Sequence, residues 1–281
     1  MEKIHFTKMQ GCGNDFVILE YSEYKKSRLF MTELARKLCD RHFGIGADGL
    51  MIPNTTTEEA DVAWYFYNSD GSTAQMCGNG MRCFARYLHD KNIIPKTSFT
   101  VKTEAGIIEP QILPNDEVRV KMSVPTLTPA QIPFKGEYNL NHKITVADRE
   151  FVGNAISMGN PHFIIFTEEN TMELAKKYGP EIETHPLFPQ KTNVEFVKIK
   201  SNKEVELSVW ERGCGITLAC GTGACAAIVA GILNNLTQNE VEVNLPGGAV
   251  TIEWQGSPDD TNHPVYLTGP ANYSFEGDFI L

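Results

Sequence analysis

The segment MCGNGMRC at residues 76–83 recurs in shorter form as ACGTGAC at residues 219–225. Each copy places a cysteine, Cys77 or Cys220, directly before a Gly-x-Gly motif. After each cysteine, apolar residues recur every three or four positions, as on one buried helical face. Before them, residues 62–66 and 205–209 alternate as strands do. The pattern predicts, twice over, a strand, a cysteine and a helix.

The repeat extends beyond the cysteines. Three motifs recur after 143 or 146 residues: Gly13-Asn14 as Gly159-Asn160, Tyr67-Asn68 as Trp210-Glu211, and Cys77 as Cys220. Chance recurrence of small glycine motifs is the alternative, and the preserved order disfavours it. A shift of about half of the 281 residues indicates two similar halves facing each other across a cleft, with one thiol on each side.

Short alternating segments with one long helix per half favour an α+β fold. We expect two pseudo-symmetric domains, each a mostly antiparallel sheet curled, or closed into a barrel, around a central helix. Strands are expected at 3–7 and 16–19 around the loop 9–15, and helices near 32–40, with Thr32 as N-cap, and 172–178. The proline-rich segment 123–135 is the candidate linker.

Composition limits the functional classes. A net charge of −10 opposes a nucleic-acid or anionic-membrane partner, because both require a basic surface. No segment has the apolar length of a signal peptide or membrane span, so a cytoplasmic protein is expected. The seven cysteines then indicate thiols rather than disulfides, and without a CxxC pair a zinc site is not expected.

The two repeated thiols point to proton transfer. A cysteine at a helix start lies in the positive field of unpaired backbone N–H groups, which favours the thiolate. The same N–H groups can bind a carboxylate. Two such thiols on opposite sides of a carbon could remove a proton from one face and return one to the other. The chemistry is that of a racemase or epimerase without pyridoxal, with the thiols starting in opposite protonation states.

Other residues have simpler readings. Three cysteines lie on helical patterns, as small buried residues do: Cys39, Cys83 and Cys225. Two others lie in glycine loops: Cys12 and Cys214. His162 tunes a thiol or only completes a turn, and Glu211 with Arg212 faces the cleft or forms a solvated pair. The segment GTGACA resembles a dinucleotide fingerprint without its βαβ setting.

At these residues the chain closely resembles the diaminopimelate epimerases. The resemblance covers nearly the whole chain, through KMQGCGNDF, NSDGSTAQMCGNGMRC, SMGNPH, TNVEF, ERGCGITLACGTGACAA and LPGGAVTIEW. It implies an enzyme without a cofactor or metal that interconverts LL- and meso-2,6-diaminopimelate by two cysteines, in lysine and peptidoglycan precursor synthesis. It also implies a homodimer and a first domain at 1–122 that is completed by 266–281, with 123–265 forming the second.

The resemblance also assigns site residues. Cys77 and Cys220 are implied as the acid/base pair, flanked by His162 and Glu211. The reacting α-carboxylate and amine are implied to lie on Gly78, Asn79, Gly221 and Thr222. The remaining substrate contacts implied are Asn14, Asn68, Asn160, Asn193, Glu211 and Arg212.

Two positions depart from the family pattern, and three alternatives stay open. Gly49 stands where some members carry a substrate-contacting glutamine, and Ile216 where many carry an acidic residue. Proline and hydroxyproline racemases share both cysteine motifs but typically have histidine where this chain has Asn79. An amino-acid epimerase with another distal pocket, or a redox protein that joins Cys77 to Cys220, is the further alternative.

Overall fold

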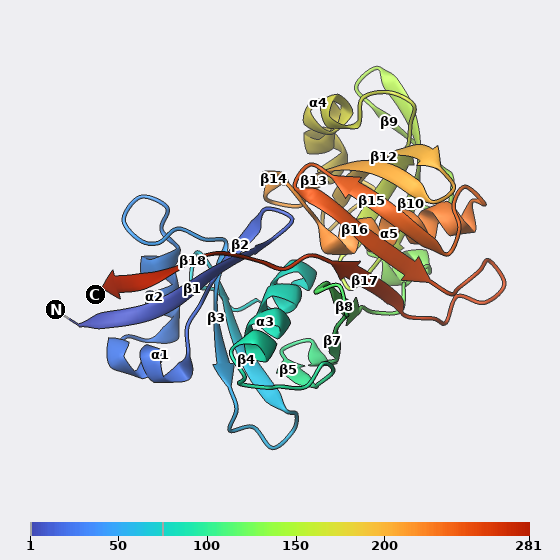
Figure 1. Cartoon of the computed structure of the whole chain (residues 1–281). Coiled ribbons are helices and arrows are strands. Elements are labelled where there is room, and N and C mark those ends of the chain that lie inside the picture. Colours follow the sequence, from blue (N-terminus) through green and yellow to red (C-terminus); the bar gives the residue numbers. More distant parts are fainter. Residues whose placement is uncertain (1, 75) are drawn as a thin grey trace. The chain divides into compact units, whose positions relative to one another are not determined.

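The computed structural model describes residues 2–74 and 76–281 and divides into two compact units (Figure 1). Unit 1 comprises Met1–Val120 and Gly269–Leu281, and unit 2 comprises Lys121–Thr268. Within the two described ranges, no helix is long and apolar enough to cross a membrane.

Unit 1 is built on a seven-stranded sheet in the order β18-β1-β2-β3-β4-β5-β6. Its strands are β1 (Lys3–Gly11), β2 (Asn14–Ile18), β3 (Gly49–Asn54), β4 (Val62–Asn68), β5 (Val101–Thr103), β6 (Gly106–Ile108) and β18 (Asn272–Ile280). Its helices are α1 (Tyr21–Ser27), α2 (Met31–Cys39) and α3 (Gly78–Asp90). A hairpin of β7 (Pro110–Ile112) and β8 (Val118–Lys121) follows β6.

Unit 2 orders its strands as β9-β10-β11-β12-β13-β15-β16-β17. These are β9 (His142–Val146), β10 (Arg149–Ser157), β11 (Pro161–Phe166), β12 (Asn193–Ser201), β13 (Glu204–Glu211), β15 (Glu240–Leu245), β16 (Gly248–Trp254) and β17 (Val265–Gly269). The short β14 (Gly215–Ile216) pairs with β13. The helices are α4 (Thr171–Glu183), α5 (Gly221–Leu233) and the 3-10 turn η1 (Pro129–Gln131).

The two sheets repeat one pairing scheme. From the edge strand inwards, β18 to β6 and β9 to β16 both pair antiparallel, antiparallel, parallel, antiparallel, parallel, antiparallel. The registers agree as well, since Val62 faces Val101 in unit 1 and Val205 faces Val243 in unit 2. The equivalent helices α3 and α5 each have 13 residues. The duplication read from the sequence is therefore present in the fold.

Each unit buries one helix against the curved sheet. In α5 every residue from Gly223 to Leu233 is buried, and the helix is apolar on all sides, as expected for a helix enclosed by a sheet. Figure 1 shows α5 behind β13, β15 and β16, and α3 occupies the corresponding place in unit 1. The predicted α+β class with a central helix in each half is confirmed.

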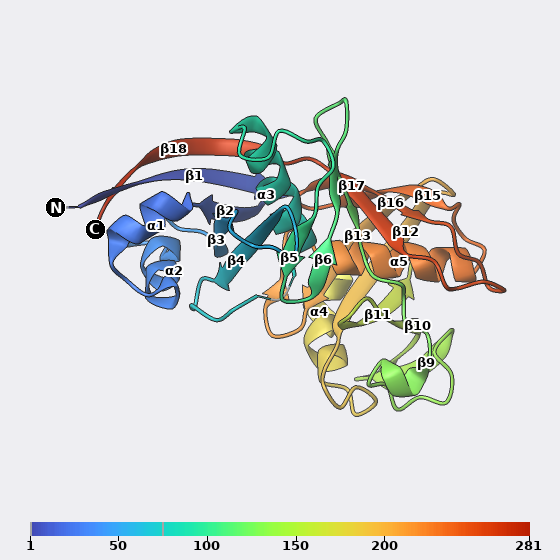
Figure 2. The same cartoon turned by 90° about the horizontal axis from the view of Figure 1, so that it is seen from below.

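The C-terminal strand β18 completes the sheet of unit 1. It pairs antiparallel with β1 from Lys3 opposite Ile280 to Gln10 opposite Asn272, and Figure 2 shows the two strands side by side. The backbone N–H of Leu281 donates to the carbonyl of Glu2 at 2.9 Å. The two ends of the chain therefore share one sheet edge.

Several local predictions were wrong. Helix α2 begins at Met31 with Phe30 as N-cap, because the Glu33 carboxylate accepts from the Phe30 N–H at 3.4 Å and replaces the capping role assigned to Thr32. Strands β1 and β2 extend into the predicted loop and leave only Cys12 and Gly13 as the turn, with φ of 53° and 83°.

Helix α1 was not predicted, because its seven residues are too few to show a periodic stripe. Helix α4 runs five residues beyond the predicted end at Tyr178. In the supposed linker 123–135, Ile132 and Phe134 are buried in the core of unit 2, so this part of the segment is a packed piece of the unit.

Candidate active site

Both repeated cysteines are the N-cap residues of the enclosed helices. Cys77 precedes α3, and its Sγ accepts from the backbone N–H of Gly80 at 3.4 Å. Cys220 precedes α5, and its Sγ accepts from Gly223 N–H at 3.3 Å. Each sulfur therefore lies at the positive end of a helix dipole, which stabilises a thiolate.

In unit 1 the tight turn at Cys12 and Gly13 brings Asn14 to the thiol. The Asn14 Oδ1 atom accepts from Cys77 Sγ and from Asn79 Nδ2, both at 3.5 Å. Asn79 is buried in the first turn of α3. Three of the predicted site residues thus meet at one helix end.

Arg82 supports this helix end and was missed by sequence reasoning. Its guanidinium is fully buried and donates to Asn79 Oδ1 at 2.9 Å, to the Pro270 carbonyl at 3.0 Å and to Cys12 Sγ at 3.6 Å. Among the described residues, no carboxylate pairs with the Arg82 guanidinium. Its only sequence signal was an arginine inside an apolar helical stripe.

In unit 2 a hydrogen-bonded chain leads to the second thiol. Asn160 donates through Nδ2 to Thr222 Oγ1 at 3.3 Å, and Thr222 Oγ1 lies 3.5 Å from Cys220 Sγ. The Asn160 Oδ1 atom lies 3.0 Å from His162 Nε2. The structure thus groups four of the predicted site residues of unit 2: Asn160, His162, Cys220 and Thr222.

Glu195 extends this chain and was also missed. Its Oε1 lies 2.7 Å from His162 Nδ1, and both side chains are fully buried. Its other oxygen, Oε2, is buried without a hydrogen-bond partner. The motif TNVEF contains Glu195, but inward placement of a glutamate on a strand cannot be read from alternation among apolar neighbours.

The second thiol lies among negative charges. Burial, and then the charges of Glu211 and Glu195, raise the pKa of Cys220 well above its usual range, while hydrogen bonds from Thr222 and Gly223 act in the opposite direction. Burial also raises the pKa of Glu211, whose Oε1 accepts from Thr217 Oγ1. Burial and the nearby carboxylates therefore favour the protonated form of Cys220 over the thiolate.

The remaining predicted site residues make hydrogen bonds within loops or open the two helices. Both ends of the Asn193 amide are engaged, with Nδ2 donating to the Pro161 carbonyl at 2.8 Å and Oδ1 accepting from Arg212 N–H at 2.9 Å. Arg212 is exposed and donates through Nη1 to the Gln190 carbonyl at 3.2 Å. Asn68 Nδ2 donates to Ser72 Oγ at 3.0 Å within its own turn. Gly78 and Gly221 open the two helices.

Both departures from the family pattern have a structural reason. A Cβ on Gly49 would lie 2.5 Å from the Phe66 ring and 2.8 Å from the Tyr67 carbonyl, so no side chain fits there. Ile216 in β14 packs against the core cluster of unit 2, where a charged side chain would be unfavourable.

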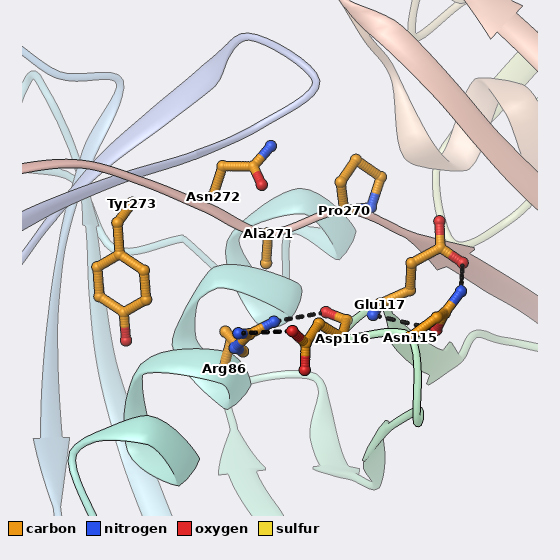
Figure 3. Close-up of a pocket in the computed structure, with 8 residues that line it drawn as sticks. All are labelled: Arg86, Asn115, Asp116, Glu117, Pro270, Ala271, Asn272 and Tyr273. Carbon is orange, nitrogen blue, oxygen red and sulfur yellow. Dashed lines mark hydrogen bonds and ion pairs between the residues drawn. The ribbon is translucent and has the colours of Figure 1, made fainter.

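No group of three or more His, Cys, Asp or Glu suited to a metal occurs among the described residues. A pocket of about 240 Å³ in unit 1 contains none of the predicted site residues (Figure 3). In it Arg86 pairs with Asp90 at 2.6 Å and with Asp116 at 3.3 Å. The thiol-bearing helix ends are therefore the candidate site.

Known structures share the fold. A phenazine biosynthesis protein of the PhzF family from Bacillus anthracis superposes over all of both chains with a TM-score of 0.72 at 15% identity. A hydroxyproline epimerase from Agrobacterium vitis superposes over 99% of this chain and 93% of its own with a TM-score of 0.69 at 14% identity. The chain therefore shares its fold with these two proteins.

The chain belongs to the diaminopimelate epimerase family. The family model for diaminopimelate epimerase matches residues 6–128 and 154–274. The diaminopimelate epimerase of Carboxydothermus hydrogenoformans is 48% identical over 99% of this chain and 100% of its own. That of Halothermothrix orenii is 45% identical over 99% of both.

Proposed function

We propose that this protein interconverts LL- and meso-2,6-diaminopimelate by proton transfer between Cys77 and Cys220, without a cofactor. The observation that carries the proposal is the repeated N-cap thiol, placed at the start of an enclosed helix in each unit of a chain from this family. One thiol removes the α-proton as a thiolate, and the other returns a proton to the opposite face.

The helix ends supply the electrostatic part of the reaction. Negative charge grows on the α-carboxylate as the α-proton leaves, and the first-turn N–H groups at Gly78, Asn79, Gly221 and Thr222 are the proposed donors. Each well-placed donor is worth about 3–4 kcal/mol in the transition state. Because burial and the nearby carboxylates favour the protonated form of Cys220, Cys77 is the proposed base for the first half-reaction.

Substrate recognition is assigned to polar side chains of both units. We infer that six polar side chains contact the diamino diacid: Asn14, Asn68, Asn160, Asn193, Glu211 and Arg212. Asn193 also holds the Arg212 backbone. An exposed arginine suits the distal carboxylate, and amide oxygens suit the ammonium groups. The proposed domains are 1–122 with 266–281, and 123–265.

We also propose a cytoplasmic homodimer with no nucleic-acid or membrane partner. The support for self-association is the edge strand β18, which exposes Tyr273, Phe275 and Ile280. Unpaired edge strands with exposed apolar side chains invite pairing with another chain. Sedimentation of the purified protein tests this, with a monomer at micromolar concentration as the contrary result.

The decisive experiment incubates the protein with LL-diaminopimelate in D2O, with reductant and no added cofactor. Loss of the α-proton NMR signal together with meso product is the expected result. Exchange only with another amino acid would keep the two-thiol chemistry and change the substrate. No exchange with diaminopimelate, proline or hydroxyproline would favour the redox alternative.

A further inference from the structure

Unit 2 buries an ionisable pair, His162 and Glu195, where unit 1 has apolar side chains. His162 and Asn193 face each other in the parallel pair β11/β12, as Phe16 and Gly49 do in β2/β3. Two residues further along, Glu195 therefore corresponds to Met51. The fold packs well with Phe16 and Met51 in unit 1, both almost fully buried, so it does not need a charged pair at this place.

A buried charged pair is weak evidence for a stabilising role. Removing two charges from water costs several kcal/mol per ion, and well-packed apolar residues often stabilise a protein as much or more. Glu195 also leaves Oε2 without a hydrogen-bond partner, which carries a further cost. The pair in unit 2 therefore has a purpose other than packing.

The pair lies directly beneath the second thiol. A Cβ on Gly223, in the first turn of α5, would lie 2.7 Å from Glu195 Oε1 and 3.2 Å from Cys220 Sγ. In unit 1 the equivalent Gly80 faces the ring of Phe16 at 3.4 Å. The carboxylate thus occupies space beside the Cys220 helix end that an apolar ring fills in unit 1.

The hydrogen-bonded chain from Glu195 to Cys220 has a direction, set by which atom donates at each step. Both ring nitrogens of His162 face side-chain oxygens, with Nδ1 2.7 Å from Glu195 Oε1 and Nε2 3.0 Å from Asn160 Oδ1. Since Asn160 Oδ1 accepts from His162, its Nδ2 faces Thr222 Oγ1, and the Thr222 hydroxyl is left to donate to Cys220 Sγ.

We propose that Glu195 is a positioning residue that, through His162, Asn160 and Thr222, aims a hydroxyl hydrogen at Cys220 Sγ and so stabilises its thiolate form. The inference rests on the proposed two-thiol function and deepens it. The hydrogen-bonded chain opposes the burial of the thiol and the charges that face it, which are those of Glu211 and Glu195. Cys220 can then act as the base when the reaction runs in reverse.

Glu195→Gln tests the direction of the chain. Without the carboxylate, the His162 ring is no longer held against Asn160 Oδ1, and the Asn160 amide can turn its oxygen toward Thr222. The Thr222 hydroxyl then donates to Asn160 instead of Cys220. The loss of one hydrogen bond to a thiolate is expected to slow iodoacetamide labelling of Cys220 about tenfold at a fixed pH near 8.5.

The measurement is peptide-level mass spectrometry on the intact free enzyme, with the labelling rate of Cys77 in the same sample as the internal control. Faster labelling of Cys220 in Glu195→Gln would overturn the proposal, because it would mean that the direct repulsion between Glu195 and the thiolate outweighs the hydrogen-bonded chain. An unchanged rate would overturn it as well.

A second pair of variants tests the proposal even if Glu195→Gln folds poorly. Thr222→Val removes the last hydroxyl and is expected to slow Cys220 labelling about tenfold, whereas Thr222→Ser keeps the hydroxyl and the rate. Equal rates in these two variants contradict the proposal. Because labelling needs no substrate, this test can fail while exchange in D2O succeeds, and the reverse also holds.

Discussion

Cys77 and Cys220 differ from the other cysteines by position. Cys39, Cys83 and Cys225 are buried within helices, and burial raises the pKa of Cys39 and of Cys83 to about 12. Each of the two N-cap sulfurs accepts a hydrogen bond from a helix N–H group three residues later. Reactivity is therefore expected where the helix field reaches the sulfur.

Replacing either N-cap sulfur tests the two-thiol assignment. Cys77→Ser and Cys220→Ser are each expected to lower kcat for LL-diaminopimelate by at least about 10³-fold, because a serine hydroxyl is a far weaker acid and one thiol serves only one face of the carbon. Steady-state assays measure the loss, and circular dichroism checks the fold. Near-normal turnover by either variant would refute the assignment.

The loop that carries Arg212 depends on one buried carboxylate. Glu183 accepts from Trp210 Nε1 at 2.8 Å, from Gly213 N–H at 3.0 Å and from Lys191 Nζ at 3.2 Å. Although burial alone would raise it, these hydrogen bonds lower the pKa of Glu183. Its stabilising effect is therefore present above the unfolded-state pKa near 4.5 and is lost as the pH falls through the lower folded value.

Glu183→Gln should accordingly lower the free energy of unfolding by about 1.5–3 kcal/mol at pH 7, the usual worth of hydrogen bonds to a charged group. The difference from wild type is expected to shrink as the pH falls below about 4.5. Denaturant unfolding at several pH values measures it. Glu181→Gln, at an exposed position on the same helix, is the matched control. A pH-independent difference would exclude the ionic explanation.

At the level of helices, α3 and α5 have the same length and the same cysteine cap, but different neighbours at their first turns. The Cβ position of Gly80 is in ordinary contact with Phe16 at 3.4 Å, whereas that of Gly223 is only 2.7 Å from Glu195 Oε1. The repeat thus preserves the cap and varies what lies under it.

The two glycines make a matched pair of variants. Gly80→Ala is expected to keep or raise stability, by up to about 1 kcal/mol, because alanine favours a helix. Gly223→Ala should lower it by about 1–3 kcal/mol, because its methyl group would displace the buried carboxylate. Thermal unfolding of both variants measures the two changes in stability. A larger loss for Gly80→Ala would contradict the packing described here.

At the level of the molecule, the proposed reaction requires Cys77 and Cys220 to come close together, because both would act on one carbon. Mild oxidation is therefore expected to join Cys77 to Cys220 and to stop turnover, with recovery on adding dithiothreitol. Mass spectrometry of a non-reduced digest identifies the bridge, and the epimerase assay follows activity. Full activity in a sample that carries the bridge would disprove the proposed arrangement.

Much of this protein follows from local pattern. The cysteine before Gly-x-Gly, the helical stripe after it and the alternating strand before it are all short-range signals, and their recurrence about half a chain apart indicated the duplicated α+β fold. Local signals failed at two places. At the start of α2, a glutamate three residues along the chain decided which residue caps the helix. In 123–135, burial in the core of unit 2 decided that part of the segment is packed.

Other features depend on residues far apart in the sequence. Arg82 reaches the carbonyl of Pro270, and Glu195 reaches His162 across two strands, which no periodicity reveals. The space at Gly49 is closed by a ring on the neighbouring strand. The sequence by itself determines the charge and shape of each side chain, and it also determines the helix caps that activate the thiols. Which partners surround each thiol was decided only by tertiary packing, because strand pairing and helix enclosure bring distant residues together.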